Sequence, residues 1–154
     1  MNEKKTTNTL TSILRSSRPE NLADYLKENE DSLIQTDKPF ASFMRETIQK
    51  KGIRQQEVFL AADISEGYGY KLISEEKHTR QRDVILRLCI AAGFDFSETQ
   101  KALKLYGMSP LYSKIPRDAV FIIAVNTGIN RLEAVDSLLK EHGFDPLYPC
   151  RIEE

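Results

Sequence analysis

The chain has 154 residues, of which 40% are hydrophobic and 29% are charged, and its formal net charge at pH 7 is −1. This composition is that of a globular protein long enough to bury a hydrophobic core. The longest apolar run, Ala119–Val125, is too short to span a bilayer, and residues 1–17 lack the apolar core of a signal peptide. We therefore expect a cytoplasmic protein, in which Cys89 and Cys150 form no structural disulfide.

Charge is distributed unevenly, although the differences are small. Residues 39–82 carry eight basic and six acidic side chains, residues 1–38 carry six and seven, and residues 83–154 carry eight and ten. Only the middle segment therefore has a positive balance. An excess of two basic groups, eight minus six, is small for a protein that binds nucleic acid. The charge is thus the main observation against tight binding of that kind.

Residues 1–38 are interpreted as an N-terminal helical arm. An apolar cluster at Leu10, Ile13 and Leu14 supports one or two helical turns and no more. Pro19 then begins a short amphipathic helix that ends near Asn29. The apolar face of this helix is expected to be Leu22, Ala23 and Leu26. Leu33 and Ile34 are expected to pack on the main body.

Apolar residues at helical spacing then predict several longer helices in residues 39–107. The first begins at Pro39 and is capped by Gly52, and a later one over about 81–92 is capped by Gly93. A further helix begins with a capping box of Ser97 and Gln100 and stops at Gly107. The core positions expected on these helices are Phe40, Phe43, Met44, Ile48, Val84, Ile85, Leu88, Ala91 or Ala92, Ala102, Leu103 and Tyr106.

Residues 108–147 predict a C-terminal pair of helices, followed by a tail over 148–154. Pro116 and Gly128 bound a run whose apolar residues leave no polar face, so burial on nearly all sides or a partner's surface is expected. A central strand is the alternative for so β-branched a run, but proline and glycine at cap positions favour a helix. The last helix begins with a capping box of Asn130 and Glu133, and its apolar stripe is Leu132, Val135, Leu138 and Leu139. No strand pattern is found, and we predict an all-α fold.

The stretch that organises these elements is residues 54–72, RQQEVFLAADISEGYGYKL. It predicts a helix from Arg54 to Ala62, with Val58, Ala61 and Ala62 inward, and a second helix over Ser65–Ile73. Asp63 tolerates the left-handed backbone angles of a tight turn, and Ser65 is placed to cap the second helix with its hydroxyl. Tyr68 and Leu72 continue a buried line from Ile64. The exposed face is then Glu66, Gly67, Tyr70 and Lys71.

This stretch resembles the helix-turn-helix of the XRE, or λ-repressor-like, family. The residues that carry the resemblance are Gln55, Val58, Ile64, Ser65 and Leu72. A closer likeness to a subgroup from Gram-positive bacteria and their mobile elements rests on Tyr68, Tyr70, Lys77, Arg82, Asp83, Leu111, Tyr112, Arg117 and Asp118. The resemblance covers about residues 40–147 and implies a compact multi-helix λ-repressor-like domain over 39–107, with the arm before it and the C-terminal pair packed on it or used for dimerisation.

Three residues depart from the family pattern. Phe59 stands where a small residue is usual, and Asp63 and Glu76 stand where glycine is usual. We expect the large ring of Phe59 to face Gly69, so that volumes are exchanged across the helix crossing rather than lost. Gly67 has no such partner and would let DNA backbone or a base approach closely.

The resemblance implies a protein that reads the major groove of double-stranded DNA. Base edges would be faced by Glu66, Gly67, Tyr70 and Lys71, with Lys71 donating to guanine and Glu66 accepting from cytosine N4. Phosphate contacts would come from Gln55, Gln56, Ser65, Lys77, His78, Arg80 and Arg82.

Other interpretations of these residues remain open at this stage. Lys77, Arg80 and Arg82 also fit an ordinary solvated loop, and Tyr70 fits a phosphate contact or a lid over Phe59. The pairs Arg82-Asp83 and Arg117-Asp118 also fit salt bridges at helix starts.

Catalysis has few candidate residues. His78 and His142 lack metal-ligand spacing to a second ligand, and no glycine-rich loop has the form that cradles phosphate. We therefore predict no enzyme activity, no metal and no cofactor.

The favoured function is a bacterial transcriptional regulator, a repressor, acting as a homodimer on DNA. The alternative is a protein-interaction module that keeps the fold without reading DNA, which the near-neutral charge, Glu66, Glu75, Glu76 and the apolar helix favour.

Overall fold

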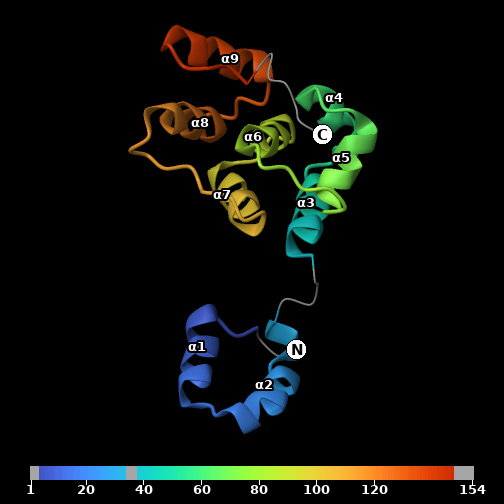
Figure 1. The fold of residues 1–154 in the computed structure, drawn as a ribbon, viewed down its shortest axis with the longest axis vertical. Helices are drawn as coiled ribbons and strands as arrows, with labels where there is room; N and C mark the ends of the chain where they lie inside the picture. The colour runs from blue at the N-terminus through green and yellow to red at the C-terminus, as the bar shows by residue number, and fades with distance from the viewer. Residues whose placement is uncertain (1–3, 34–37, 148–154) are drawn as a thin grey trace. The chain divides into compact units, whose positions relative to one another are not determined.

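The computed structural model describes residues 4–33 and 38–147 (Figure 1). Within these ranges it contains nine α-helices, two short 3-10 helices and no strand, so the predicted all-α class is confirmed. None of the described helices is long and apolar enough to cross a membrane. The α-helices are α1 (Thr7–Ser16), α2 (Leu22–Glu28), α3 (Pro39–Lys50), α4 (Gln55–Ala62), α5 (Glu66–Ile73), α6 (Arg82–Ala91), α7 (Phe96–Leu105), α8 (Pro116–Asn126) and α9 (Leu132–Glu141).

The chain divides into two units, Met1–Asp37 and Lys38–Glu154. In the first unit, α1 has ten residues and is longer than the one or two turns expected. Local capping explains the extra length, because the Thr6 side chain accepts from the Thr9 N–H and the Ser17 hydroxyl donates to the Ile13 carbonyl. Leu33 belongs to this unit, whereas Ile34 and the predicted tail lie outside the described residues.

The predicted apolar face of α2 is wrong. Leu22 and Leu26 are 54% and 48% exposed, whereas Tyr25 is buried. Asn29, one turn further on, is buried with Tyr25 and donates from its side-chain nitrogen to the Tyr25 carbonyl at 2.9 Å. It also accepts from the Lys5 ammonium. A hydrogen-bonded polar group therefore defines the inner side of this short helix instead of its leucines.

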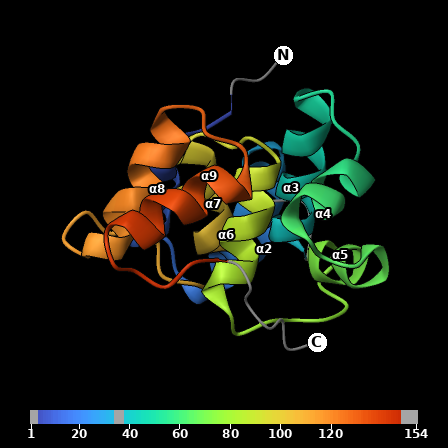
Figure 2. The same cartoon turned by 90° about the horizontal axis from the view of Figure 1, so that it is seen from above.

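The second unit is built around α6. Every residue from Val84 to Ile90 is buried, and α6 contacts α4, α7 and α9. Figure 2 shows α6 between helices α3 to α5 on one side and helices α7 to α9 on the other. The expected inner face was narrower, because helical spacing placed only Val84, Ile85, Leu88 and Ala91 or Ala92 toward the core. A helix surrounded by other helices buries polar positions as well as apolar ones.

Helix α8 is exposed on one side. Phe121, Ala124 and Val125 are buried, but Ile123 is 59% exposed. Burial within the unit therefore does not cover this helix on all sides, and the alternative of a partner's surface stays a prediction. The core side is completed by Leu132, Val135 and Leu139 of α9, as predicted. Asp118 in the first turn of α8 is buried, which the apolar pattern did not indicate.

Both predicted capping boxes are wrong. The box of α7 is formed by Asp95 and Glu98, two residues earlier than expected. Gln100 instead holds the loop after α7, because its side chain donates to the Leu111 carbonyl at 2.9 Å and accepts from the Leu111 N–H at 2.7 Å. The residue before α9 is Arg131, which makes no side-chain cap to that helix. A capping box needs a specific backbone geometry, which residue spacing alone does not supply.

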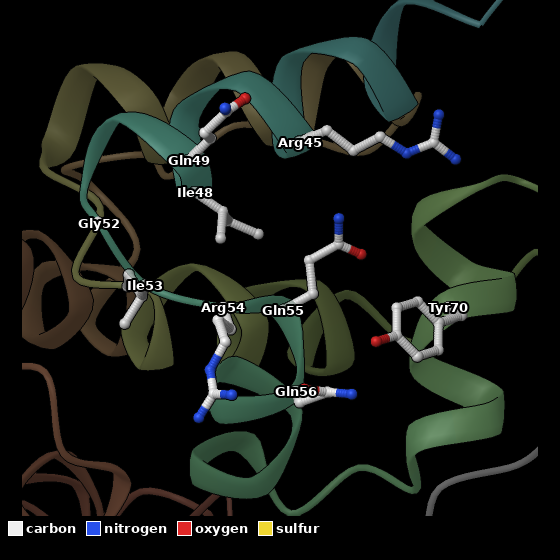
Figure 3. Close-up of a pocket in the computed structure, with 9 residues that line it drawn as sticks. All are labelled: Arg45, Ile48, Gln49, Gly52, Ile53, Arg54, Gln55, Gln56 and Tyr70. Carbon is white, nitrogen blue, oxygen red and sulfur yellow. The ribbon is translucent and has the colours of Figure 1, made fainter.

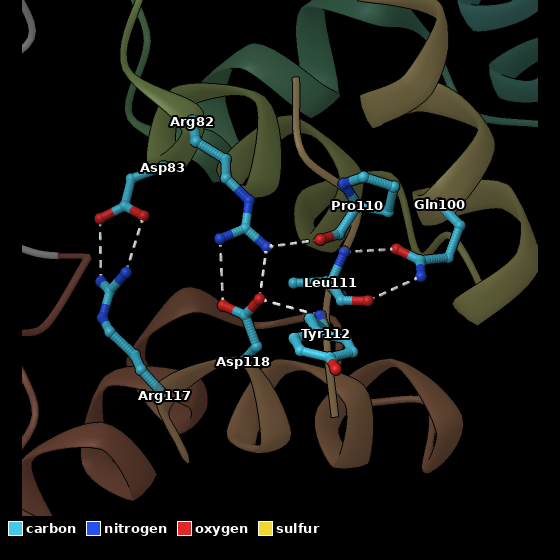
Figure 4. Close-up of polar contacts among 8 residues, drawn as sticks. All are labelled: Arg82, Asp83, Gln100, Pro110, Leu111, Tyr112, Arg117 and Asp118. Atoms are coloured by element: carbon cyan, nitrogen blue, oxygen red, sulfur yellow. Dashed lines mark hydrogen bonds and ion pairs between the residues drawn. The ribbon is translucent and has the colours of Figure 1, made fainter. Parts of the chain in front are cut away.

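Helices α6 and α8 are joined at their N-termini by two crossed ion pairs (Figure 4). Arg82 of α6 donates to both carboxylate oxygens of Asp118 at 3.0 and 2.7 Å, and Arg117 of α8 donates to both oxygens of Asp83 at 2.9 and 2.8 Å. Each Arg-Asp dipeptide thus pairs with the other dipeptide, not with itself. The hydrogen bond with Asp83 raises the pKa of Arg117 above its ordinary value. The two ion pairs therefore attach α8 to the N-terminus of α6, which directly follows the loop after α5.

The two crossed pairs differ in burial, which predicts different costs for matched substitutions. The Asp118 side chain is 3% exposed and also accepts from the Tyr112 N–H, whereas the Asp83 side chain is 24% exposed. Asp118→Asn should lower the free energy of unfolding by about 2–3 kcal/mol, because it weakens hydrogen bonds to a buried charge. Asp83→Asn should cost about 1 kcal/mol or less. Urea unfolding of the two variants checks this, and equal losses would contradict the role given to burial.

Candidate nucleic-acid interface

Helices α4 and α5 are joined by the tight turn that the sequence predicts. Asp63 has φ 53° and ψ 47°, in the left-handed region. The N–H of Ile64 donates to the Phe59 carbonyl at 3.0 Å, which closes the end of α4. Ile64, Tyr68 and Leu72 are buried on the same side of the second helix. Ala61, which was expected to face inward, is exposed, and Phe59 is buried as its expected contact with Gly69 requires.

A buried arginine on α6 forms a hydrogen bond with the C-terminal end of α4. Arg87 of α6 is 1% exposed, and its Nε donates to the Ala62 carbonyl at 3.0 Å. Its Nη2 also lies 3.8 Å from a carboxylate oxygen of Asp63. A cation at a helix C-terminus satisfies carbonyl groups that have no partner in the helix. Sequence analysis missed Arg87, although an arginine inside the otherwise apolar run from Val84 to Ile90 is a usable signal.

The crossing of the two helices depends on Phe59 and Gly69. A Cβ atom added at Gly69 would lie 2.5 Å from Cδ1 of Phe59, closer than any ordinary contact. The predicted exchange of volumes across the crossing is therefore confirmed. The Phe59 ring also meets the ring of Tyr70 edge-on, with centroids 5.0 Å apart and an interplanar angle of 83°. The core contact thus extends to a side chain on the outer face of α5.

The outer face of α5 carries the four residues expected there. Glu66, Gly67, Tyr70 and Lys71 are all exposed. The Glu66 carboxylate accepts from the Gln56 side chain at 3.1 Å, which links the start of α5 to the start of α4. A Cβ added at Gly67 would meet no heavy atom of the described residues within 4 Å. Packing therefore does not require glycine at that position.

The residues predicted to contact phosphate fall into several environments. Gln55 is half-buried, and Gln56 is exposed and bonded to Glu66. Ser65 precedes α5 as expected, but its side chain forms no capping hydrogen bond with the described N–H groups of that helix. Arg82 is held inside the protein by Asp118 and, at 3.4 Å, by the Pro110 carbonyl. We therefore remove Arg82 from the set of phosphate contacts, because its terminal nitrogens are already engaged.

The loop over 74–81 presents the remaining basic residues. Lys77, His78 and Arg80 are exposed, while Thr79 is buried and its N–H donates to the Tyr106 hydroxyl at 2.7 Å. The His78 ring stacks on Tyr106 with centroids 4.2 Å apart. Burial raises the pKa of Tyr106 above its ordinary value, although the Thr79 hydrogen bond opposes this. The loop is therefore tied to α7 in its middle, with a basic residue on either side.

A concave surface of about 640 Å³ lies between α3, the start of α4 and α5 (Figure 3). A second one, of about 410 Å³, shares three of its residues, Arg45, Gln55 and Tyr70, and reaches Lys71. Sequence analysis missed Arg45, which follows the core residue Met44 and is exposed on α3. The residues lining the first surface are Arg45, Ile48, Gln49, Gly52, Ile53, Arg54, Gln55, Gln56 and Tyr70.

The two glycines of α5 give a matched test of the helix crossing. Gly69→Ala should lower the free energy of unfolding by about 1–3 kcal/mol, because its Cβ overlaps the Phe59 ring. Gly67→Ala should instead raise it by up to about 1 kcal/mol, because alanine favours the helix and the site is open. Thermal unfolding followed by circular dichroism measures both. A neutral Gly69→Ala variant would show that the crossing does not depend on this contact.

Arg87→Leu should lower the free energy of unfolding by about 2–3 kcal/mol, because a buried carbonyl at the end of α4 loses its charged donor. Arg45→Leu removes the same charge from an exposed position and should change stability by about 0.5 kcal/mol or less. Guanidinium unfolding of the two variants provides the comparison. If Arg87→Leu lowers the free energy of unfolding no more than Arg45→Leu does, the Arg87 hydrogen bond does not stabilise the end of α4.

Comparisons of the chain with models of protein families, with curated protein sequences and with solved structures found no match. Among the described residues, no group of three or more His, Cys, Asp or Glu side chains could hold a metal ion. Conclusions about function therefore rest on the exposed face of α5 and on the side chains around it.

Proposed function

We propose that the second unit binds double-stranded DNA as a λ-repressor-like helix-turn-helix domain, with α5 in the major groove. The observation that carries this proposal is the division of α5 into two faces. Tyr68, Leu72 and Ile73 are buried, while the opposite side of α5 is exposed. The contact between Gly69 and Phe59 packs α5 closely against α4. A helix that reads the major groove needs one face packed on the protein and the other face exposed to the DNA.

The exposed side chains suit contacts with base edges. Lys71 forms no ion pair with the described residues and can donate to guanine O6 or N7. Glu66 can accept from cytosine N4, and its bond to Gln56 holds it in place beside the groove. The open space above Gly67 lets DNA approach the helix backbone.

Basic residues flank this face on both sides. Arg45 lies on α3, and Lys77 and Arg80 lie on the loop after α5; all three are exposed. None of them forms an ion pair with the residues that the structure describes. Contacts of this kind with phosphate fix the position of a protein on DNA and supply most of its affinity.

The biological role that follows is transcriptional regulation, as a repressor in the bacterial cytoplasm. A homodimer would double the contacts by placing two α5 helices in successive major grooves. The exposed Ile123 on α8 favours a protein-interaction role as the second candidate, in which the same fold binds a protein and not DNA.

Binding to a random-sequence duplex at two salt concentrations separates these functions. We expect the affinity of the parent to fall about fortyfold between about 50 and 200 mM salt, as for three phosphate contacts. Lys71→Ala combined with Arg80→Ala should weaken binding at the lower salt by about tenfold or more.

The matched control combines Lys104→Ala with Lys140→Ala, which removes the same charge from α7 and α9. This control should bind like the parent. Absent binding, or equal loss in both double variants, would reject DNA recognition by α5 and favour the protein-interaction module.

A further inference from the structure

Three hydrogen-bonding side chains where α3, α4 and α5 meet on the larger concave surface have no partner among the described residues, as is also true of Gln49 on α3. They are the Arg45 guanidinium, the Gln55 carboxamide and the Tyr70 hydroxyl, and they come from α3, α4 and α5. Figure 3 shows the Gln55 and Tyr70 side chains directed into the space between α3 and α5, which Arg45 borders. All three groups can donate a hydrogen bond, and the guanidinium adds a positive charge. Such a set favours an anion with several acceptor oxygens.

The position of Tyr70 is set from the protein interior. Its ring is 41% exposed, and one side of it meets the buried Phe59 ring edge-on at 5.0 Å. Phe59 cannot shift toward α5 without striking the backbone at Gly69, nor can it leave the core without exposing its apolar surface. Tyr70 is therefore oriented by the same contact that fixes the helix crossing.

We propose that Tyr70 contacts a backbone phosphate of the DNA, together with Arg45 and Gln55, and that Phe59 is the positioning residue that aims its hydroxyl. This inference rests on the proposed DNA binding and deepens it. It takes Tyr70 out of the base-facing group and chooses the phosphate contact, which the sequence left open as an alternative. Glu66, Gly67 and Lys71 are left to face the bases.

The two roles of Tyr70 predict different patterns of binding. A phosphate contact supports every DNA sequence equally, whereas a contact with a base edge supports one base over the others. The first probe is a duplex enriched from a random library by the parent protein. The second is the unselected random-sequence duplex, and the third is a set of single-base variants of the enriched duplex.

Tyr70→Phe keeps the ring and its contact with Phe59 but removes the hydroxyl. We expect the Kd to rise about tenfold on the enriched and the random duplex alike, because one hydrogen bond to a charged acceptor is lost. The ranking of the single-base variants should stay unchanged. A loss confined to particular base pairs, or no loss at all, would overturn the phosphate assignment.

The positioning role of Phe59 is tested by a double-mutant cycle with the Tyr70 hydroxyl. Phe59→Leu keeps apolar bulk without a flat ring, and Phe59→Ala with Gly69→Val restores a small residue on α4 and a branched one on α5. The second background approximately conserves volume and remains usable if Phe59→Leu fails to fold. In either folded background, adding Tyr70→Phe should raise the Kd by about twofold or less. A full tenfold rise there would show that Phe59 does not position Tyr70.

The outcomes distinguish this inference from the function on which it rests. If the parent binds neither duplex, both fail together. If Lys71→Ala with Arg80→Ala weakens binding while Tyr70→Phe equals the parent, DNA recognition stands and only the phosphate contact fails. Circular dichroism of each variant confirms that a loss of binding does not come from unfolding.

Discussion

The contact between the Phe59 ring and the bare backbone at Gly69 determines how α5 is presented. A side chain at position 69 would overlap the ring, so the observed distance between the two helices requires glycine opposite Phe59. With the crossing fixed, Ile64 and Leu72 are buried beneath α5, and the opposite side of the helix faces outward. The position of the Tyr70 ring follows from the same contact.

Polar groups inside the protein hold this pair of helices in place. Arg87 reaches from α6 to the carbonyl at the end of α4, and Arg82 reaches from the start of α6 to Asp118 of α8. Both arginines lie on the helix at the centre of the unit, so the turn at Asp63 and the C-terminal helices are attached to one support. Removing one partner from such a buried contact leaves a polar or charged group without compensation, so these contacts disfavour other arrangements of the helices.

Local charge is more informative than the net charge of −1. Two acidic residues near the interface are engaged, because Glu57 pairs with Arg54 and Glu66 accepts from Gln56. The exposed Glu76 also lines the second concave surface, and its carboxylate forms no ion pair with the described residues. Of the cations around α5, Arg45, Lys71, Lys77 and Arg80 form no ion pair within the part of the chain that the structure describes. A near-neutral protein can therefore place several unpaired cations around one helix.

The sequence by itself determined the helical class, the boundaries of α3 to α6 to within one residue, and the exposed face of α5. These features depend on apolar periodicity and on turn residues such as Asp63, which are local properties. Only the tertiary structure decided the crossed pairing of Arg82 with Asp118, the burial of Arg87 and the place of Arg45 beside Tyr70. Each of these depends on which distant helix lies opposite a side chain, and residue spacing along one helix carries no information about that.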